Sequence, residues 1–355
     1  MDQGEKSVAE ERNPQWEHRD GRRRLMLYSP GHRARGKVPR EVDFLRRTWQ
    51  IGELDYQVGQ AVTGERVVLL TPHSSTSTGG RKQLDREIKF GNRLWLGTEP
   101  TMLARLIGFD DDHDADPPVA LFSHSGTPLA RTAAGLTTSD RMHVAQGLLT
   151  ALQQLSQARV VHRALSPDTV LWDGSQKSIQ ITRFGQAAIL GEARAGGPAF
   201  ASWSAPEQVG GTGQAAADDD LYSAALLLFW LYTGEQPAAG PATMRERLAL
   251  QDDELRRRLD GMFSDEAAVR PSLERLSRRW QPSILAGRVP PRVDDEARKE
   301  FAALRERQRA DVTPLFNPSV VAPAPTFSAA RKQRAAVLIA VVIIVVIVVG
   351  LMGGL

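Results

Sequence analysis

Apolar positions along this 355-residue chain change their spacing near residue 128, and the change predicts two structural parts. Between residues 51 and 123, short apolar runs such as "ERVVLLT" alternate with turn residues, a pattern typical of β-strands. One helix is expected within this part, over "RKQLDREIKFGNRLWL" at residues 81–96. The first part is therefore predicted to be a small, strand-rich lobe with a single helix.

Beyond Pro128 the apolar residues follow helical spacing. Residues 139–158 carry one apolar stripe, which predicts an amphipathic helix. The run "DDDLYSAALLLFWLYTGE" is apolar on nearly all sides, so we expect it to be the buried central helix of a second lobe. "RPSLERLSRRW" predicts a later helix. The chain is thus predicted to be α+β, with a small lobe over about 51–127 and a helical lobe over about 128–283.

The first 50 residues are predicted to form a separate basic extension. Two short runs around Asp20-Gly21 predict a hairpin, and "VPREVDFLRRTW" predicts a helix because its apolar residues share one helical face. Basic residues crowd this region: Arg19, Arg22, Arg23, Arg24, Arg33, Arg35, Lys37 and Arg40. Such a cluster can attract nucleic acid or anionic lipid, but we expect a solvated surface because no nucleic-acid motif accompanies it.

The C-terminal residues predict a membrane span. Residues 335–355 read "AAVLIAVVIIVVIVVGLMGGL" without a charge, and at about 1.5 Å per residue they match the roughly 30 Å hydrocarbon core of a bilayer. Arg331, Lys332 and Arg334 stand just before this segment, which places that flank in the cytoplasm by the positive-inside rule. A single-pass, C-terminal transmembrane helix is predicted, with the remainder of the chain cytoplasmic. A charged helix and a Pro-rich juxtamembrane linker are expected over 284–334.

Composition narrows the chemistry. Charged residues make up 25% and hydrophobic residues 41% of the chain, which is ordinary for a globular protein. No cysteine is present, so disulfides, thiolate nucleophiles and cysteine metal sites are excluded. His113, His124 and His143 lack the spacing of metal ligands and are expected at the surface.

Five short motifs follow one another through the central part of the chain. They are "HRALSPDTVL" from His162, "ITRFGQAA" from Ile181, "SAPEQ" from Ser204, "DDLYSAALLL" from Asp219 and "VRPSLERL" from Val269. In this order they resemble the catalytic loop, the I-T-D-F-G-L-A segment, the A-P-E motif, the D-x-Y-S-L-G helix and the R-P-S element of protein kinases, of the bacterial, eukaryotic-like serine/threonine type. One match would be weak, but five in order are specific. The resemblance covers roughly Ile51–Trp280 and implies the two-lobed protein-kinase fold.

The resemblance implies that positions which hold the helical lobe together are present. Glu207 and Arg270 are expected to form its buried ion pair. Asp220 is expected to accept hydrogen bonds from the backbone of the catalytic loop. His162 and Arg163 match a core histidine and an arginine that gathers phosphate in active relatives. Because the neighbouring aspartate is missing, a structural role is expected for both.

The positions that carry chemistry in the family are changed. Phosphoryl transfer needs a Gly-rich loop, a strand lysine, an Asp and an Asn for magnesium, and an Asp that orients the hydroxyl. "GELDYQVGQAV" lacks the G-x-G-x-x-G spacing. The residues that match the lost positions are Leu70, Ala164, Ser166, Thr169 and Arg183. Arg183 puts a fixed positive charge at the metal position, where each unit of like charge costs roughly 4 kcal/mol at about 4 Å and an effective dielectric constant near 20. No metal and no cofactor are therefore expected; the alternative is ATP without a normal magnesium site.

Glu87 matches the helix glutamate that pairs with the strand lysine in the family. Without that lysine, one prediction is that Glu87 pairs with Arg183 across the cleft. The other is that Glu87 is simply solvated.

The sequence as a whole favours a membrane-anchored pseudokinase, a catalytically silent kinase fold that acts as a cytoplasmic signalling scaffold or regulator. Its expected partner is a cytoplasmic or membrane protein, and nucleic acid is not expected. The alternative is an unorthodox ATP-dependent serine/threonine protein kinase or another nucleotide-dependent transferase, with Arg183 contacting phosphate. A third class is a lipid or nucleic-acid binder that uses the N-terminal basic cluster, whose binding would depend steeply on salt.

Overall fold

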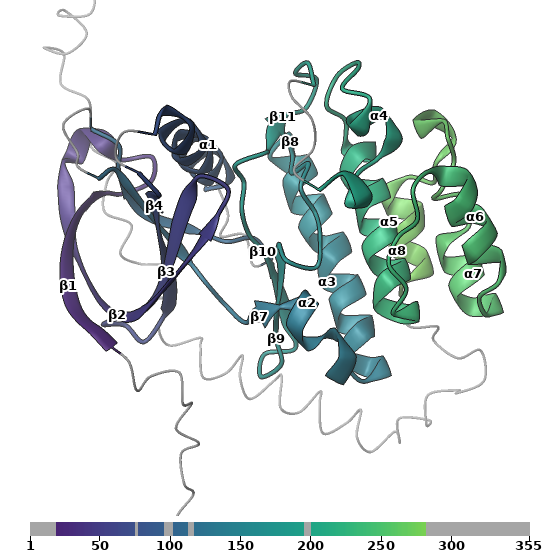
Figure 1. The fold of residues 1–355 in the computed structure, drawn as a ribbon, viewed down its shortest axis with the longest axis horizontal. Helices are drawn as coiled ribbons and strands as arrows, with labels where there is room; N and C mark the ends of the chain where they lie inside the picture. Colours follow the sequence, from purple (N-terminus) through teal and green to yellow (C-terminus); the bar gives the residue numbers. More distant parts are fainter. Residues whose placement is uncertain (1–18, 75–76, 96–101, 113–116, 195–199, 282–355) are drawn as a thin grey trace, which may run out of the picture. The chain divides into compact units, whose positions relative to one another are not determined.

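The computed structural model describes residues 19–74, 77–95, 102–112, 117–194 and 200–281 (Figure 1). The chain divides into two compact units, Met1–Pro282 and Ser283–Leu355, and every described residue lies in the first. A strand-rich lobe is followed by a helical lobe, as the sequence predicts.

The small lobe is a closed six-stranded barrel with one α-helix. Its elements are β1 (Arg19–Tyr28), the 3-10 helix η2 (Arg33–Arg35), β2 (Lys37–Ile51), β3 (Leu54–Ala61), β4 (Arg66–Pro72), α1 (Thr78–Leu94), β5 (Leu106–Asp110) and β6 (Val119–Ser123). The strands follow the order β1-β2-β3-β4-β6-β5, and Tyr28 opposite Phe109 closes the ring. A closed barrel has no free sheet edge, so this lobe leaves no strand unpaired in the described chain.

Strand alternation divides the barrel residues between two cores. The inner face holds Leu27, Val42, Phe44, Val67, Leu69 and Leu121. Gly59 also lies here, because a Cβ atom at this position would come within 2.6 Å of the Val42 side chain. On the other face of β3 and β4, Tyr56 and Leu70 pack with α1 residues in the main core.

Three predictions for residues 1–50 are wrong. Residues 38–49 belong to β2 and not to a helix, because the chain here pairs with β1 on one side and β3 on the other. Asp20-Gly21 is no hairpin turn but an irregularity within β1, with a φ of 103° at Gly21. Since β1 and β2 complete the barrel, the folded unit does not begin at residue 51 as predicted.

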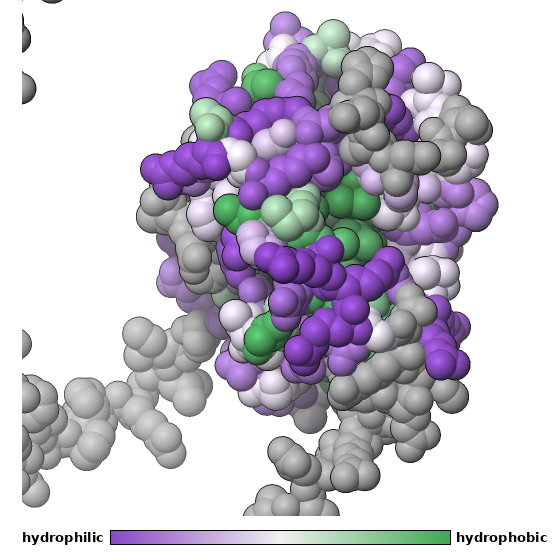
Figure 2. Space-filling view, turned by 90° about the vertical axis from the view of Figure 1, so that its left-hand side faces the viewer, coloured by the Kyte–Doolittle hydropathy of each residue, from purple (hydrophilic) through white to green (hydrophobic). Residues whose placement is uncertain are grey.

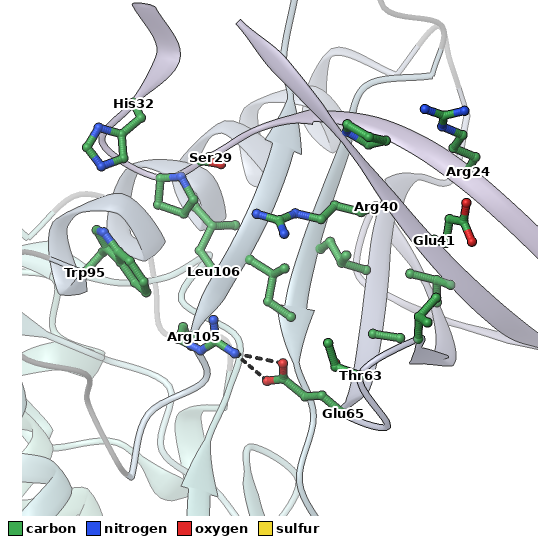
Figure 3. Close-up of a pocket in the computed structure, with 17 residues that line it drawn as sticks. Arg24, Ser29, His32, Arg40, Glu41, Thr63, Glu65, Trp95, Arg105 and Leu106 are labelled. Carbon is green, nitrogen blue, oxygen red and sulfur yellow. Dashed lines mark hydrogen bonds and ion pairs between the residues drawn. The ribbon is translucent and has the colours of Figure 1, made fainter. Parts of the chain in front are cut away.

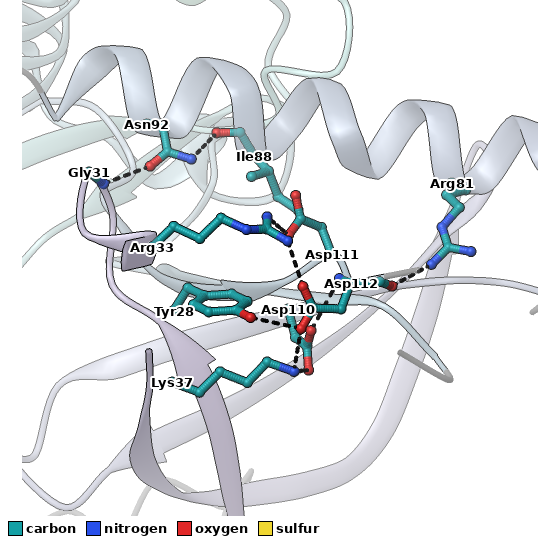
Figure 4. A network of polar contacts seen from close by, with 10 residues as sticks. All are labelled: Tyr28, Gly31, Arg33, Lys37, Arg81, Ile88, Asn92, Asp110, Asp111 and Asp112. Atoms are coloured by element: carbon teal, nitrogen blue, oxygen red, sulfur yellow. Dashed lines mark hydrogen bonds and ion pairs between the residues drawn. The ribbon is translucent and has the colours of Figure 1, made fainter. Parts of the chain in front are cut away.

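A polar network joins the β1–β2 hairpin to the end of β5 (Figure 4). Lys37 Nζ lies 2.7 Å from Asp110 Oδ2 and 2.9 Å from Asp112 Oδ2, and the Tyr28 hydroxyl donates to Asp112 Oδ2 at 2.8 Å. Arg33 pairs with Asp111 and Asp112. Hydrogen bonds from Lys37 and Tyr28 lower the pKa of the Asp112 carboxyl. These contacts hold the barrel closed between β1 and β5, where Tyr28 and Phe109 are the one residue pair in register in the described strands.

The helical lobe is built around α5 (Ala217–Thr233), which is buried on nearly all sides as predicted. Its other α-helices are α2 (Leu129–Thr132), α3 (Thr138–Gln157), α4 (Pro206–Val209), α6 (Pro241–Ala249), α7 (Asp253–Leu259) and α8 (Leu273–Arg279). The 3-10 helices are η3 (Ala133–Gly135), η4 (Ala201–Trp203) and η5 (Ala267–Val269). The strands are β7 (Thr127–Pro128), β8 (Val160–Val161), β9 (Val170–Asp173), β10 (Ser178–Ile181) and β11 (Ala188–Ile189). The main core runs through both lobes, since Leu70 and Phe90 share it with Leu148 and Phe229.

The side of the molecule formed by the barrel is mostly hydrophilic, with apolar surface in the middle of the face (Figure 2). Within the part of the chain that the structure describes, no helix combines the length and the apolar character needed to cross a bilayer. The predicted membrane helix at 335–355 and the linker at 284–334 lie outside the described residues. Both stay predictions.

Candidate active site

The structure brings most of the predicted site residues together where four segments meet. These are β4 with Leu70, α1 with Glu87, the loop 162–169 between β8 and β9, and the loop 182–187 after β10. Leu70 belongs to the same buried core as Leu165 and Phe184 from the two loops. The site therefore lies where the cores of the two lobes meet.

Asp220 anchors the backbone of the loop 162–169. Its carboxylate accepts hydrogen bonds from the backbone N–H groups of His162 at 2.6 Å and Arg163 at 2.8 Å, as predicted. Arg163 has a left-handed φ of 65°, and the Gln208 amide donates to its carbonyl at 2.6 Å. These three contacts fix a backbone conformation that non-glycine residues seldom adopt.

His162 is a neutral core residue. Burial lowers its pKa to about 4. Its Nε2–H donates to the Thr182 carbonyl at 2.9 Å, while Nδ1 accepts from the Ala164 N–H at 3.3 Å. The ring packs edge-on against Phe184 with 5.4 Å between centroids. The histidine thus joins the two loops of the site by packing and hydrogen bonding.

The positions that match catalytic residues are used for the loop's own structure. Ala164 is buried and has no acidic group. The Thr169 hydroxyl donates to the Ala164 carbonyl at 2.9 Å and accepts from the Ser166 N–H at 2.9 Å. Its proton and one of its two lone pairs are therefore used within the loop. The Ser166 hydroxyl is buried and has no hydrogen-bond partner among the described residues.

Arg183, which the resemblance matches to a metal ligand, faces Tyr56. Its guanidinium carbon lies 5.9 Å from the centre of the Tyr56 ring, within the range of a cation–π contact. Within the described ranges, the Arg183 side chain makes no hydrogen bond or ion pair, and the Tyr56 hydroxyl is buried without a partner. Tyr56 stands opposite Leu70 in the β3–β4 pair. An aromatic ring, an aliphatic side chain and a cation therefore stand at and beside the positions that the resemblance matches to a lysine and a metal carboxylate.

Glu87 differs from both predictions. It is only 1% exposed, so it is not solvated, and no ion pair joins it to Arg183 in the described structure. Its carboxylate instead accepts hydrogen bonds from the backbone N–H groups of Phe184 at 2.7 Å and Gly185 at 2.9 Å. Burial raises the pKa of Glu87 to about 7, against the opposite effect of these two bonds. The glutamate thus ties α1 to the loop after β10 without a lysine.

This raised pKa predicts how stability depends on pH. Because Glu87 holds its proton more tightly in the folded chain than in the unfolded one, unfolding releases the proton between pH 4.5 and about 7, and stability falls as the pH rises through this window. In Glu87→Gln the free energy of unfolding should fall less steeply there, by up to about 1.4 kcal/mol per pH unit. Denaturant titrations from pH 5 to 9 measure this slope. The two curves should run parallel above pH 8, and parallel curves at every pH would contradict the prediction.

The structure also shows an arginine cluster that sequence reasoning missed. Arg194 forms an ion pair with Asp219, with 2.6 Å between Nη2 and Oδ1, and both side chains are buried. Arg86 from α1 donates to the Ala187 carbonyl at 2.7 Å. Burial lowers the pKa of Arg163, the nearby Asp219 opposes this effect, and the charges of Arg86 and Arg194 add to it. Arg163 and Arg194 thus both lie near Asp219, and Arg86 adds its charge beside Arg163. The three arginines come from separate segments, so no local sequence pattern marks the cluster.

The predicted ion pair between Glu207 and Arg270 is present. Arg270 forms two hydrogen bonds with Glu207, at 2.6 Å to Oε1 and 3.0 Å to Oε2, and its side chain is fully buried. This pair joins α4 to the turn before α8.

Of the histidines expected at the surface, His143 is exposed and His113 lies outside the described residues. His124 is only partly exposed, and burial together with the charges of Arg66 and Arg183 lowers its pKa to about 4. His124 is therefore neutral near pH 7 and lies close to positive charge from Arg66 and Arg183.

The residues present do not fit the magnesium ion that the kinase fold implies. The Thr169 hydroxyl is engaged within its own loop, and Arg183 is a cation. In the described ranges, no three His, Cys, Asp or Glu side chains lie close enough together to hold a metal ion. No step of a reaction is therefore assigned to a metal here.

Comparison with known proteins identifies part of the chain. Residues 121–279 match the family model of the protein kinase domain. CBL-interacting protein kinases 15 and 14 of Oryza sativa subsp. japonica are each 30% identical to this chain over 127 residues, covering 34% of this chain and 28% of each relative. The chain thus spans little more than a quarter of these relatives. A protein kinase domain is present, and its matched part begins in β6, so β1–β5 lie outside it.

Proposed function

We propose that this protein is a pseudokinase, a kinase fold that binds a signalling partner without transferring phosphate. The observation that carries the proposal is the group of Leu70, Tyr56 and Arg183, where an aliphatic chain and a cation stand at the positions matched to the strand lysine and the metal carboxylate. Ala164 lacks the acidic group that would orient a hydroxyl. The anchoring contacts of Asp220, Glu207 and Glu87 are kept, which supports selection for the fold rather than for the reaction.

The proposal includes a membrane anchor at 335–355 and a cytoplasmic orientation of the kinase domain, both inferred from the sequence. The bacterial, eukaryotic-like type is likewise inferred from the motifs. Confinement at a membrane raises the effective concentration of a protein that docks on the fold. A cytoplasmic or membrane protein is the proposed partner.

Thermal unfolding with and without MgATP tests the silent cleft. A ligand at ten times its dissociation constant stabilises a folded protein by about 1.4 kcal/mol. We expect no change in the melting temperature of the full-length protein in lipid nanodiscs at millimolar MgATP. A clear rise, followed by transfer of labelled phosphate to any substrate, would overturn the proposal.

Restoring one catalytic position should not restore activity. Ala164→Asp restores the acidic group. The lysine and the two metal ligands are still missing, because Leu70, Thr169 and Arg183 stand at their positions. We expect phosphate transfer to stay at the background of the wild-type protein in a radiolabel assay. Transfer above that background would show that the remaining positions suffice.

A second candidate function rests on the unpaired guanidinium of Arg183. The charges of Arg66 and Arg183 both act on His124, so this region is positively charged. Arg183 could contact phosphate here without a metal, which favours a nucleotide-dependent transferase of unusual type. The same unfolding experiment with ATP and EDTA discriminates between the two. Stabilisation by ATP that persists in EDTA and is lost in Arg183→Gln would support this candidate.

A further inference from the structure

A pocket of about 740 Å³ lies at one end of the barrel, away from the candidate active site (Figure 3). Its walls come mainly from apolar residues, among them Val42, Ala61, Leu106, Ile107 and Leu121. The turn after β1 contributes Ser29 and Pro30 to its lining, so the pocket exists only because β1 and β2 complete the barrel. Its volume falls within the roughly 300–1,000 Å³ of typical small-molecule sites.

Arg40 puts a cation into this apolar pocket. On β2 it lies two residues before Val42 and four before Phe44, so it shares their inward-facing side of the strand. Figure 3 shows its side chain extending into the middle of the pocket. Its Nε atom is buried and finds no hydrogen-bond partner in the described chain. In the described chain no hydrogen bond or ion pair engages the two terminal nitrogens of Arg40 either, so these nitrogens can pair with an anion that enters the pocket.

The other charges that line the pocket do not satisfy Arg40. Glu65 forms two hydrogen bonds with Arg105, at 2.6 and 2.8 Å, so its carboxylate is already paired. Arg24 and Glu41 face each other on neighbouring strands, and both are exposed. Among the described arginines that line the pocket, Arg40 is thus the one that is partly buried and has no ion pair.

We infer that the barrel pocket binds a small amphiphile with an apolar body and a single anionic head, either a carboxylate or a phosphate monoester. The apolar walls would bury the body, and Arg40 would pair with the head through two N–H groups. This site is independent of the proposed pseudokinase function, because it shares no residue with the cleft.

The test uses the full-length protein in lipid nanodiscs, with empty nanodiscs as the reference. The probes are 4-phenylbutyrate, 4-phenylbutyl phosphate, 4-phenylbutanol and 4-phenylbutylamine, which share one apolar body and differ in the head. Titration calorimetry is expected to show saturable binding of the two anions and binding at least tenfold weaker for the alcohol and the amine. The tighter of the two anions identifies the head group.

Substitutions test whether Arg40 and the pocket are responsible for the binding. Arg40→Gln should weaken binding of the tighter anion by about tenfold or more, because a charge-assisted pair is lost. Arg22→Gln removes an exposed arginine of β1 outside the pocket and should leave binding unchanged. If Arg40→Gln does not fold, Ala61→Leu, which fills part of the pocket, should weaken binding instead. Absence of saturable anion binding, or equal binding by wild type and Arg40→Gln, would overturn the inference.

Discussion

Replacing Asp219 by asparagine is expected to lower the free energy of unfolding by about 3–5 kcal/mol, the usual cost of removing one partner of a buried ion pair. The Asp219 side chain is fully buried and that of Arg194 is 7% exposed. Oδ1 lies 2.6 Å from Arg194 Nη2, and Oδ2 lies 3.1 Å from Nε. Asparagine leaves the Arg194 charge buried without a counter-ion, close to the charge of Arg163.

Chemical denaturation of the wild type and the variant measures this change. Asp253→Asn is a matched control, because Asp253 also lies in the first turn of a helix and pairs with an arginine, Arg256, but is 72% exposed. Exposed pairs contribute up to about 1 kcal/mol, so this control should unfold nearly like the wild type. Equal losses in the two variants would show that burial of the Asp219 pair is not what makes it matter. The pair anchors Arg194 to α5, so its loss should also loosen this part of the helical lobe, whose surface is available to a partner.

Gly126→Ala is expected to cost roughly 3 kcal/mol or more. Gly126 lies between β6 and β7, in the connection from the barrel to the helical lobe, and has a φ of +97°. A Cβ atom here would stand 2.4 Å from the carbonyl carbon and oxygen of Trp172. Overpacking against the backbone costs about 1–3 kcal/mol, and a left-handed conformation adds about 1–2 kcal/mol for an L-residue. Neither the connection nor β9 can relax without shifting the other.

Thermal unfolding compares this variant with Gly135→Ala. Gly135 has no atom within 4 Å of a Cβ placed on it, and no positive φ is recorded there. This substitution should therefore change stability by about 0.5 kcal/mol or less in either direction. A Gly126→Ala protein as stable as the Gly135→Ala protein would show that the lobe connection tolerates a side chain, contrary to its geometry.

The hydrophobic pattern of the sequence predicted the helices of the helical lobe correctly. The apolar stripe on residues 139–158 lies in α3, and the apolar run after Asp220 lies in α5. In both cases helical spacing decides which residues can be buried together. The pattern gave the wrong element for residues 38–49, whose apolar residues fit both a helix and a strand. The segment is a strand because it pairs with β1 and β3, and a short window of sequence does not contain both partners.

The candidate site shows the same division. The motif positions Ala164, Thr169 and Arg183 could be located by their order in the chain, and so could the acceptor role of Asp220. The actual partners of Glu87 could not, since they are backbone N–H groups almost one hundred residues away. Backbone donors carry no side-chain identity, so a sequence pattern does not reveal them.

By itself, the sequence determined which chemical groups this protein has: a kinase-like order of motifs, no acid at Ala164, a cation at Arg183 and an apolar segment at 335–355. Only the tertiary structure decided how these groups are used. It closed residues 19–51 into the barrel, placed Arg40 in a pocket, and brought Arg194 onto Asp219. The physical reason is that composition and spacing set what can be buried. Which groups meet depends on long-range packing, through contacts between residues far apart in the chain.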